Sequence, residues 1–179
     1  MAFTFIRLRL LALALLLLTS IGIAAPAEQT RSSATVQPTA ARKAAPEFAL
    51  QDSSGHTVSL KNYRGKVVLL DFWATWCHGC QQEIPWFAGF QRKYGARGLT
   101  VVGVSLDGDG WRAVKPFLLT ADVPYRILLG NDDTAKRYGI KNMPDTFLID
   151  RRGRIAAAYA GLVDKDNVEA NIQTMLSQP

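Results

Sequence analysis

The strongest constraint on the fold is a strand-to-helix junction that carries the chain's only two cysteines, Cys77 and Cys80. Residues 67–72 form an almost continuous apolar run, which is typical of a central strand buried on both faces. Residues 77–94 then place apolar side chains at helical spacing, which predicts a helix. Cys77 therefore lies near a helix N-terminus, where unpaired backbone N–H groups and the helix dipole lower a thiol pKa.

Three kinds of site can hold two cysteines at this spacing. A structural disulfide here would close too small a loop to constrain the unfolded chain much. Half of a zinc site would need further ligands, and the chain offers no second cysteine pair and only His56 and His78 as histidines. We therefore favour a redox-active dithiol. Residues 107–110 lack most ligand positions of a calcium loop and are predicted to be a turn, so no metal site is expected.

The N-terminus has the pattern of an export signal. Two arginines precede the apolar residues 10–25, and Ala25-Pro26-Ala27 supplies small residues for a peptidase. Residues 1–27 are therefore predicted to be a signal peptide or, if they are retained, a single N-terminal membrane anchor. Either outcome places the folded domain in the periplasm or another extracytoplasmic compartment.

The remaining chain divides into a polar segment and one domain. Residues 28–45 are rich in Gln, Thr, Arg, Ser, Ala and Pro, with Val36 the only large apolar residue, which predicts a flexible linker. Residues 46–179 are long enough for a single domain with its own core. The net charge is +6, and the densest basic cluster, residues 151–154, lacks interleaved aromatic residues. We interpret it as solvated turn charge and expect no nucleic-acid partner.

The pattern of the domain predicts an α/β fold. Two hairpins, three further strands and four helices are expected, in this order: a hairpin over 48–60, a strand over 67–72, a helix over 77–94, a strand over 100–105, a helix over 111–119, an edge strand over 125–129, a short helix over 134–138, a hairpin over 146–159 and a last helix from Asp164 or Asp166 to about Ser177. This order is typical of a mixed central sheet with helices on both faces.

Two segments resemble a known family. The first runs Asp71-Phe72-Trp73-Ala74-Thr75-Trp76-Cys77-His78-Gly79-Cys80-Gln81-Gln82-Glu83-Ile84-Pro85, and the second is Met143-Pro144-Asp145-Thr146-Phe147. Both are similar to exported TlpA/ResA-like thiol–disulfide oxidoreductases of the thioredoxin superfamily. The resemblance implies a thioredoxin-like fold with an added N-terminal β-hairpin and no cofactor. The chain departs from the family at His78-Gly79, where a proline usually precedes the second cysteine, at Asp71, where many members carry an uncharged residue, and at Asp145, where threonine is commoner.

The resemblance assigns a role to each cysteine. Cys77, at the helix start and expected to be partly exposed, is the predicted nucleophile. Cys80 is the predicted buried resolving thiol that closes the Cys77–Cys80 disulfide and releases the partner. A protonated His78 would stabilise the Cys77 thiolate; alternatively it is an exposed loop side chain with little effect.

Two acids lie close to the pair in sequence. Asp71, six residues before Cys77, is predicted to be a buried carboxylate of raised pKa that accepts the proton of Cys80; the alternative is an ion-paired or solvated acid at a strand end. Glu83, about one helical turn after Cys80, either tunes the pKa values of the cysteines or is simply a first-turn acid that the helix dipole favours.

Further residues are expected around the site. Pro144 is assigned a cis peptide bond by resemblance and would present the backbone of Met143 to an extended client chain. Trp76 is predicted to form an apolar rim for a partner protein, whereas Trp73 and Trp86 are predicted to belong to the core.

The resemblance also implies partners. These are client proteins with cysteines and a membrane electron donor of the thiol–disulfide relay type, with the chain acting as a reductant in a process such as cytochrome c maturation. Two other functions stay open. One is a thiol peroxidase of the same fold, although the usual proline upstream of a peroxidatic cysteine is missing. The other is a non-enzymatic copper-binding module, for which no histidine other than His78 is at hand.

Overall fold

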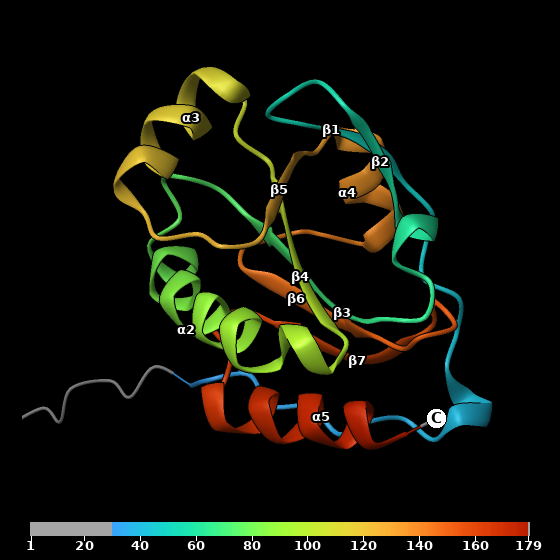
Figure 1. The fold of residues 1–179 in the computed structure, drawn as a ribbon. Coiled ribbons are helices and arrows are strands. Elements are labelled where there is room, and N and C mark those ends of the chain that lie inside the picture. Colours follow the sequence, from blue (N-terminus) through green and yellow to red (C-terminus); the bar gives the residue numbers. More distant parts are fainter. Residues whose placement is uncertain (1–29, 179) are drawn as a thin grey trace, which may run out of the picture.

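The structure, a computed structural model, describes residues 30–178 (Figure 1). The predicted signal or anchor over residues 1–27 lies outside this range. No helix within residues 30–178 is long and apolar enough to cross a membrane. The strands are β1 (Ala49–Asp52), β2 (Thr57–Ser59), β3 (Val67–Trp73), β4 (Leu99–Ser105), β5 (Arg126–Leu129), β6 (Asp145–Ile149) and β7 (Ile155–Ala160). The helices are α2 (His78–Tyr94), α3 (Trp111–Thr120), α4 (Asp132–Tyr138) and α5 (Lys165–Ser177), with 3-10 turns η1 (Thr39–Ala41), η2 (Leu60–Tyr63) and η3 (Gly95–Arg97).

The seven strands form one mixed sheet in the order β2-β1-β5-β4-β3-β6-β7. β3 is central, parallel to β4 and antiparallel to β6, and all seven of its residues are buried. In Figure 1, α2 and α5 lie on one side of the sheet and α4 on the other. The α/β class, the mixed sheet and the N-terminal hairpin β1–β2 are confirmed.

Alternation along β3 decides which side chains reach the helix α2. Val68, Leu70 and Phe72 pack into the cluster that contains Tyr138 of α4. Val67 and Leu69 pack into the opposite cluster, which is built with α2 and α5. Because successive side chains of a strand point to opposite faces, Asp71 projects toward α2 as well.

The predicted edge strand is an interior strand. β5 pairs in parallel with β4 and antiparallel with β1. Its outer side is therefore covered by the N-terminal hairpin, through the pairs Gln51 with Leu129 and Asp52 with Leu128. The prediction of an edge was wrong because the sequence does not indicate where a separate hairpin will add to a sheet.

Residues 30–45, here called the N-terminal strap, pack along the domain, in contrast to the flexible linker predicted for residues 28–45. The strap runs beside the free edge of β7, where the Gln37 N–H donates to the Ala156 carbonyl (2.8 Å) and the Ile155 N–H donates to the Lys43 carbonyl (2.8 Å). Backbone hydrogen bonds to an otherwise unpaired edge hold the strap. Because these bonds need few apolar side chains, a composition argument does not detect them.

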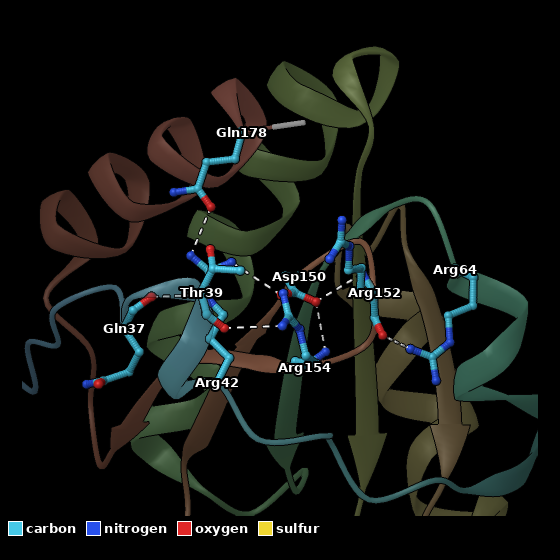
Figure 2. A network of polar contacts seen from close by, with 8 residues as sticks. All are labelled: Gln37, Thr39, Arg42, Arg64, Asp150, Arg152, Arg154 and Gln178. Atoms are coloured by element: carbon cyan, nitrogen blue, oxygen red, sulfur yellow. Dashed lines mark hydrogen bonds and ion pairs between the residues drawn. The ribbon is translucent and has the colours of Figure 1, made fainter.

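One buried arginine fixes the far end of the strap (Figure 2). Arg42 is 8 % exposed and donates to Asp150 (3.2 Å), to Gln178 (2.9 Å) and to the Gln37 carbonyl (2.9 Å). Burial favours the protonated form of Asp150, but hydrogen bonds from Arg154 and Arg42 outweigh it and lower its pKa. The basic cluster is therefore not wholly solvated, since Arg154 belongs to this network.

A candidate dithiol active site

The two cysteines form a disulfide at the start of α2. Their sulfurs are 2.05 Å apart and their Cα atoms 5.2 Å apart. Cys77 is the N-cap residue of α2, and its Sγ accepts a hydrogen bond from the Cys80 N–H (3.2 Å). A backbone donor at a helix N-terminus thus already points at this sulfur, which favours a thiolate there when the disulfide opens.

The cysteines differ in exposure, and Cys77 is more buried than expected. Cys77 is 6 % exposed and Cys80 is 0 % exposed. Both belong to an apolar cluster with Trp73. This packing explains why Cys77 is less exposed than predicted. The difference in exposure still has the expected direction, because Cys77, the predicted nucleophile, is the more exposed of the two cysteines.

Exposed side chains flank Cys77 on both sides. Trp76 is 69 % exposed, and His78 is exposed as the first residue of α2. Trp73 is 1 % exposed, which confirms it as core. Trp86 is half-buried at the edge of the core, where the Arg31 guanidinium lies 5.6 Å from its ring centroid.

A proline loop packs directly on the dithiol. The Met143–Pro144 peptide bond is cis, as the resemblance implied. A methyl group added to Gly79 would lie 3.2 Å from Pro144 Cδ, so the proline ring packs on the second of the two residues between the cysteines. Met143 packs on the same apolar cluster as both cysteines. A side chain at position 79 would therefore require the Pro144 ring to move by a few tenths of an ångström.

Asp71 is a buried acid without a compensating partner. It is 1 % exposed, and neither of its carboxylate oxygens makes a hydrogen bond in the described part of the chain. Its register partner on β6 is Thr146, whose hydroxyl lowers the pKa of Asp71 but does not outweigh burial. Burial raises the pKa of Asp71 to about 8. The alternative of an ion-paired or solvated acid is therefore wrong.

Glu83 is a second buried acid on the facing helix. It is 0 % exposed, its Oε1 accepts a hydrogen bond from the Val163 N–H (2.7 Å), and its Oε2 has no partner. Burial, and then the charge of Asp71, raise its pKa to about 9. Glu83 lies beyond the first turn of α2, which begins at His78, so the explanation by the helix dipole is wrong.

Asp107 supports the site in a way that the sequence analysis missed. Its carboxylate accepts hydrogen bonds from the Thr75 N–H (3.1 Å), from Thr75 Oγ1 (2.6 Å) and from Ser105 Oγ (2.8 Å). It thereby fixes the loop that leads into Cys77. Its position just after β4, beside the end of β3, was the available signal, because the carboxyl ends of parallel strands meet at one edge.

The arrangement is suited to thiol–disulfide exchange. A disulfide at a helix N-terminus provides a sulfur that can be stabilised as a thiolate, and the pKa values of the buried acids Asp71 and Glu83 are raised into the range of an ordinary thiol. Residues 30–178 contain no group of three or more His, Cys, Asp or Glu side chains that could hold a metal ion.

Comparisons with known proteins agree with this chemistry. A sequence model described as the AhpC/TSA family matches residues 41–158. The chain is 31% identical over 132 residues to the thiol-disulfide oxidoreductase ResA of Geobacillus kaustophilus, covering 73% of this chain and 75% of that protein. It is 34% identical over 130 residues to the thioredoxin-like protein YneN of Bacillus subtilis, covering 72% and 76%.

Solved structures show the same architecture. A Chlorobium tepidum protein assigned as the thiol:disulfide interchange protein DsbE superposes with a TM-score of 0.69 at 35% identity, covering 83% of this chain and 100% of that one. The thioredoxin domain of the thiol-disulfide oxidoreductase BVU-2223 from Bacteroides vulgatus superposes with a TM-score of 0.68 at 26% identity, covering 74% and 96%.

Proposed function

The chain belongs to the AhpC/TSA family and is a thioredoxin-like thiol–disulfide oxidoreductase, and on that premise we propose that it reduces disulfides of client proteins outside the cytoplasm. The observation that carries the proposal is the Cys77–Cys80 disulfide at the N-terminus of α2, with Pro144 packed against Gly79 between the cysteines. Export rests on the signal-like residues 1–27. The electrons would come from a membrane donor of the relay type, and apocytochrome c is the client class that we favour.

The proposed reaction has two exchange steps. The Cys77 thiolate attacks one sulfur of the client disulfide, forming a mixed disulfide and releasing the other client sulfur as a thiolate. Cys80 then loses its proton and attacks Cys77 Sγ, which forms the Cys77–Cys80 disulfide and releases the second client sulfur. The client gains two electrons and the enzyme pair becomes oxidised; the two client thiolates are then protonated by the proton that Cys80 lost and by the one that Cys77 released to solvent when it ionised.

Asp71 is the proposed proton acceptor in the second step. Its pKa of about 8 lies close to that of an ordinary thiol, so proton transfer from Cys80 is nearly balanced in energy. Glu83, whose pKa is raised to about 9 partly by the charge of Asp71, is the proposed tuning group, because the protonation states of two interacting buried acids depend on each other. His78 would stabilise the Cys77 thiolate when it is protonated.

Client binding is proposed on the exposed surface beside Cys77. Trp76 provides an apolar rim, and the backbone of Met143 can pair with an extended client segment next to Pro144. Alternating side chains of the client would then meet the rim, while its cysteine reaches Cys77.

Trapping of the mixed disulfide tests the proposal. Cys80→Ala leaves Cys77 able to attack but removes the resolving thiol, so disulfide-linked partners should accumulate and be identifiable by mass spectrometry. Cys77→Ala is the matched control and should trap none. The proposal fails if Cys80→Ala traps no partner and the wild type does not reduce insulin; turnover of peroxide instead would favour the thiol peroxidase.

A further inference from the structure

We propose that the N-terminal strap is a positioning element of the dithiol site, because Ser32 holds the turn 161–164 whose backbone N–H groups bind both Glu83 and Pro144. The inference rests on the proposed role of Glu83 as the group that tunes the site. It assigns a redox role to a segment that the family model, which begins at residue 41, leaves partly outside its match.

The strap grips this turn through backbone bonds on both sides of Val163. The Ser32 N–H donates to the Leu162 carbonyl (2.7 Å), and the Asp164 N–H donates to the Ser32 carbonyl (2.8 Å). These two bonds form a parallel bridge between Ser32 and Val163. Ser32 therefore fixes the orientation of the Val163 peptide without using any side chain.

A second pair of contacts locks the strap two residues further on. The Ala34 N–H donates to Asn167 Oδ1 (2.9 Å), and Asn171 Nδ2 donates to the Ala34 carbonyl (2.8 Å). Both asparagines belong to α5, which begins directly after the turn. The start of the strap, the turn and the first part of α5 are thus joined as one unit.

The other side of the turn reaches the site. The Gly161 N–H donates to the Pro144 carbonyl (2.8 Å), and the Val163 N–H donates to Glu83 Oε1 (2.7 Å). Val163 is 0 % exposed, so solvent water does not reach Glu83 to replace the hydrogen bond from the Val163 N–H. The bond from Val163 is the single hydrogen bond made by the Glu83 carboxylate within residues 30–178. The orientation of this one peptide consequently decides how well the Glu83 anion is stabilised.

No positively charged group among those of residues 30–178 that shift the pKa of Glu83 stabilises its anion. Asp71 faces it from β3 and Asp145 from β6, and both charges oppose ionisation of Glu83. Tyr125, just before β5, has its pKa raised by burial and by the charges of Asp71 and Glu83. The Val163 N–H is the group that lowers the pKa of Glu83, so loosening the turn should raise that pKa further.

The middle of the strap offers a matched control. The Gln37 N–H donates to the Ala156 carbonyl (2.8 Å), a bond of the same kind and length as that of Ser32. It contacts the edge of β7 rather than the turn. In the full chain, Ser32→Pro and Gln37→Pro each delete one backbone N–H that the strap donates to the domain. Only the bond lost in Ser32→Pro holds the turn that donates to Glu83.

The experiment is an NMR titration of the Glu83 side-chain carboxyl in the oxidised protein, whose cysteines do not titrate, with Glu83→Gln identifying the signal. A hydrogen bond to a charged group is worth about one pH unit or more in a protonation equilibrium. We expect Ser32→Pro to raise the midpoint by about one pH unit, and Gln37→Pro to leave it unchanged. Equal shifts in the two variants, or a shift in neither, would overturn the proposal.

Two further measurements complete the test. If Ser32→Pro does not fold, Asn167→Ala removes the side-chain acceptor of the Ala34 N–H while every backbone bond stays, and a smaller upward shift is expected; no shift would overturn the proposal. The pH profile of Cys77 alkylation in the reduced protein should change in Ser32→Pro but not when Glu83→Gln is already present. The titration needs no catalytic turnover, so a failed trapping experiment and a failed titration count against different proposals.

Discussion

Removal of the Asp71 carboxylate should make the protein more stable and a poorer enzyme. An ordinary aspartate ionises with a pKa of 3.8 in the unfolded chain, whereas burial raises the folded pKa of Asp71 to about 8. The folded state therefore keeps a proton that the unfolded state has lost. Stability from this group is fully present below the unfolded pKa and is lost as the pH rises toward the folded pKa.

The size of the effect follows from the shift. Each pKa unit corresponds to about 1.4 kcal/mol, so the cost of keeping Asp71 reaches on the order of 5 kcal/mol at about pH 8. An asparagine keeps the shape but leaves a buried amide with Thr146 as its nearest polar neighbour, which costs about 2 kcal/mol. We expect Asp71→Asn to raise the free energy of unfolding by about 3 kcal/mol near pH 8, and to give no gain near pH 4.

Urea unfolding of the oxidised protein across this pH range measures the difference. The matched control is Asp150→Asn, the same substitution at a buried acid whose pKa is lowered by hydrogen bonds from Arg154 and Arg42. It should destabilise the protein at neutral pH, with a loss that shrinks as acid protonates Asp150 in the wild type. An effect of Asp71→Asn that does not vary with pH would refute the reasoning, because Asp71 would then not titrate in this window.

The same variant separates stability from catalysis. If Asp71 accepts the proton of Cys80, Asp71→Asn should slow the release of client from the mixed disulfide while attack by Cys77 proceeds normally. Attack is measured by alkylation of Cys77, and release by single-turnover reduction of a disulfide substrate. Unchanged release would remove Asp71 from the mechanism even if the stability prediction held.

Three further predictions concern the immediate surroundings of the dithiol. His78→Ala should raise the pKa of Cys77 by about half a unit at low salt and lower the reduction potential, measured by thiolate absorbance and glutathione equilibration; values within error of wild type would assign His78 no role. Gly79→Ala places a methyl group 3.2 Å from Pro144 Cδ, so it should destabilise the oxidised protein by about 1 kcal/mol in thermal unfolding, and a neutral effect would show that the proline loop yields. Asp107→Ala leaves the half-buried donors of Thr75, in the loop before Cys77, unpaired and should cost about 2 to 4 kcal/mol in urea unfolding. A cost below about 0.5 kcal/mol would exclude the anchoring role.

Local patterns in the sequence were sufficient for the centre of the fold. The apolar run before Cys77 identified β3, and helical spacing after it identified α2, because both elements are determined by short-range periodicity. The burial of Asp71 followed from its place between apolar neighbours. The cis bond before Pro144 came from resemblance alone. Its contact with Gly79 was not predicted, because it joins segments far apart in the chain.

Long-range backbone contacts were beyond the reach of the sequence. The strap is held by hydrogen bonds of peptide groups, which every residue possesses, so its composition resembles that of a linker. Glu83 was ambiguous for the same reason, because its partner is the backbone of Val163, 80 residues away. Asp107 resembled an ordinary turn acid until the structure brought Thr75 next to it.

The strap also constrains where the dithiol can face if residues 1–27 are retained as an anchor. A flexible linker over residues 28–45 would have let the domain rotate freely above a membrane. Because the strap is docked from its first residues, only residues 26–29 separate the apolar stretch from Thr30, a distance of about 18 Å at full extension. Ser32 lies at the turn that holds Pro144, so the anchor would direct the dithiol end of the domain toward the membrane. In that orientation the proposed membrane electron donor would meet the dithiol directly, and the proposed clients would compete with it for the same surface.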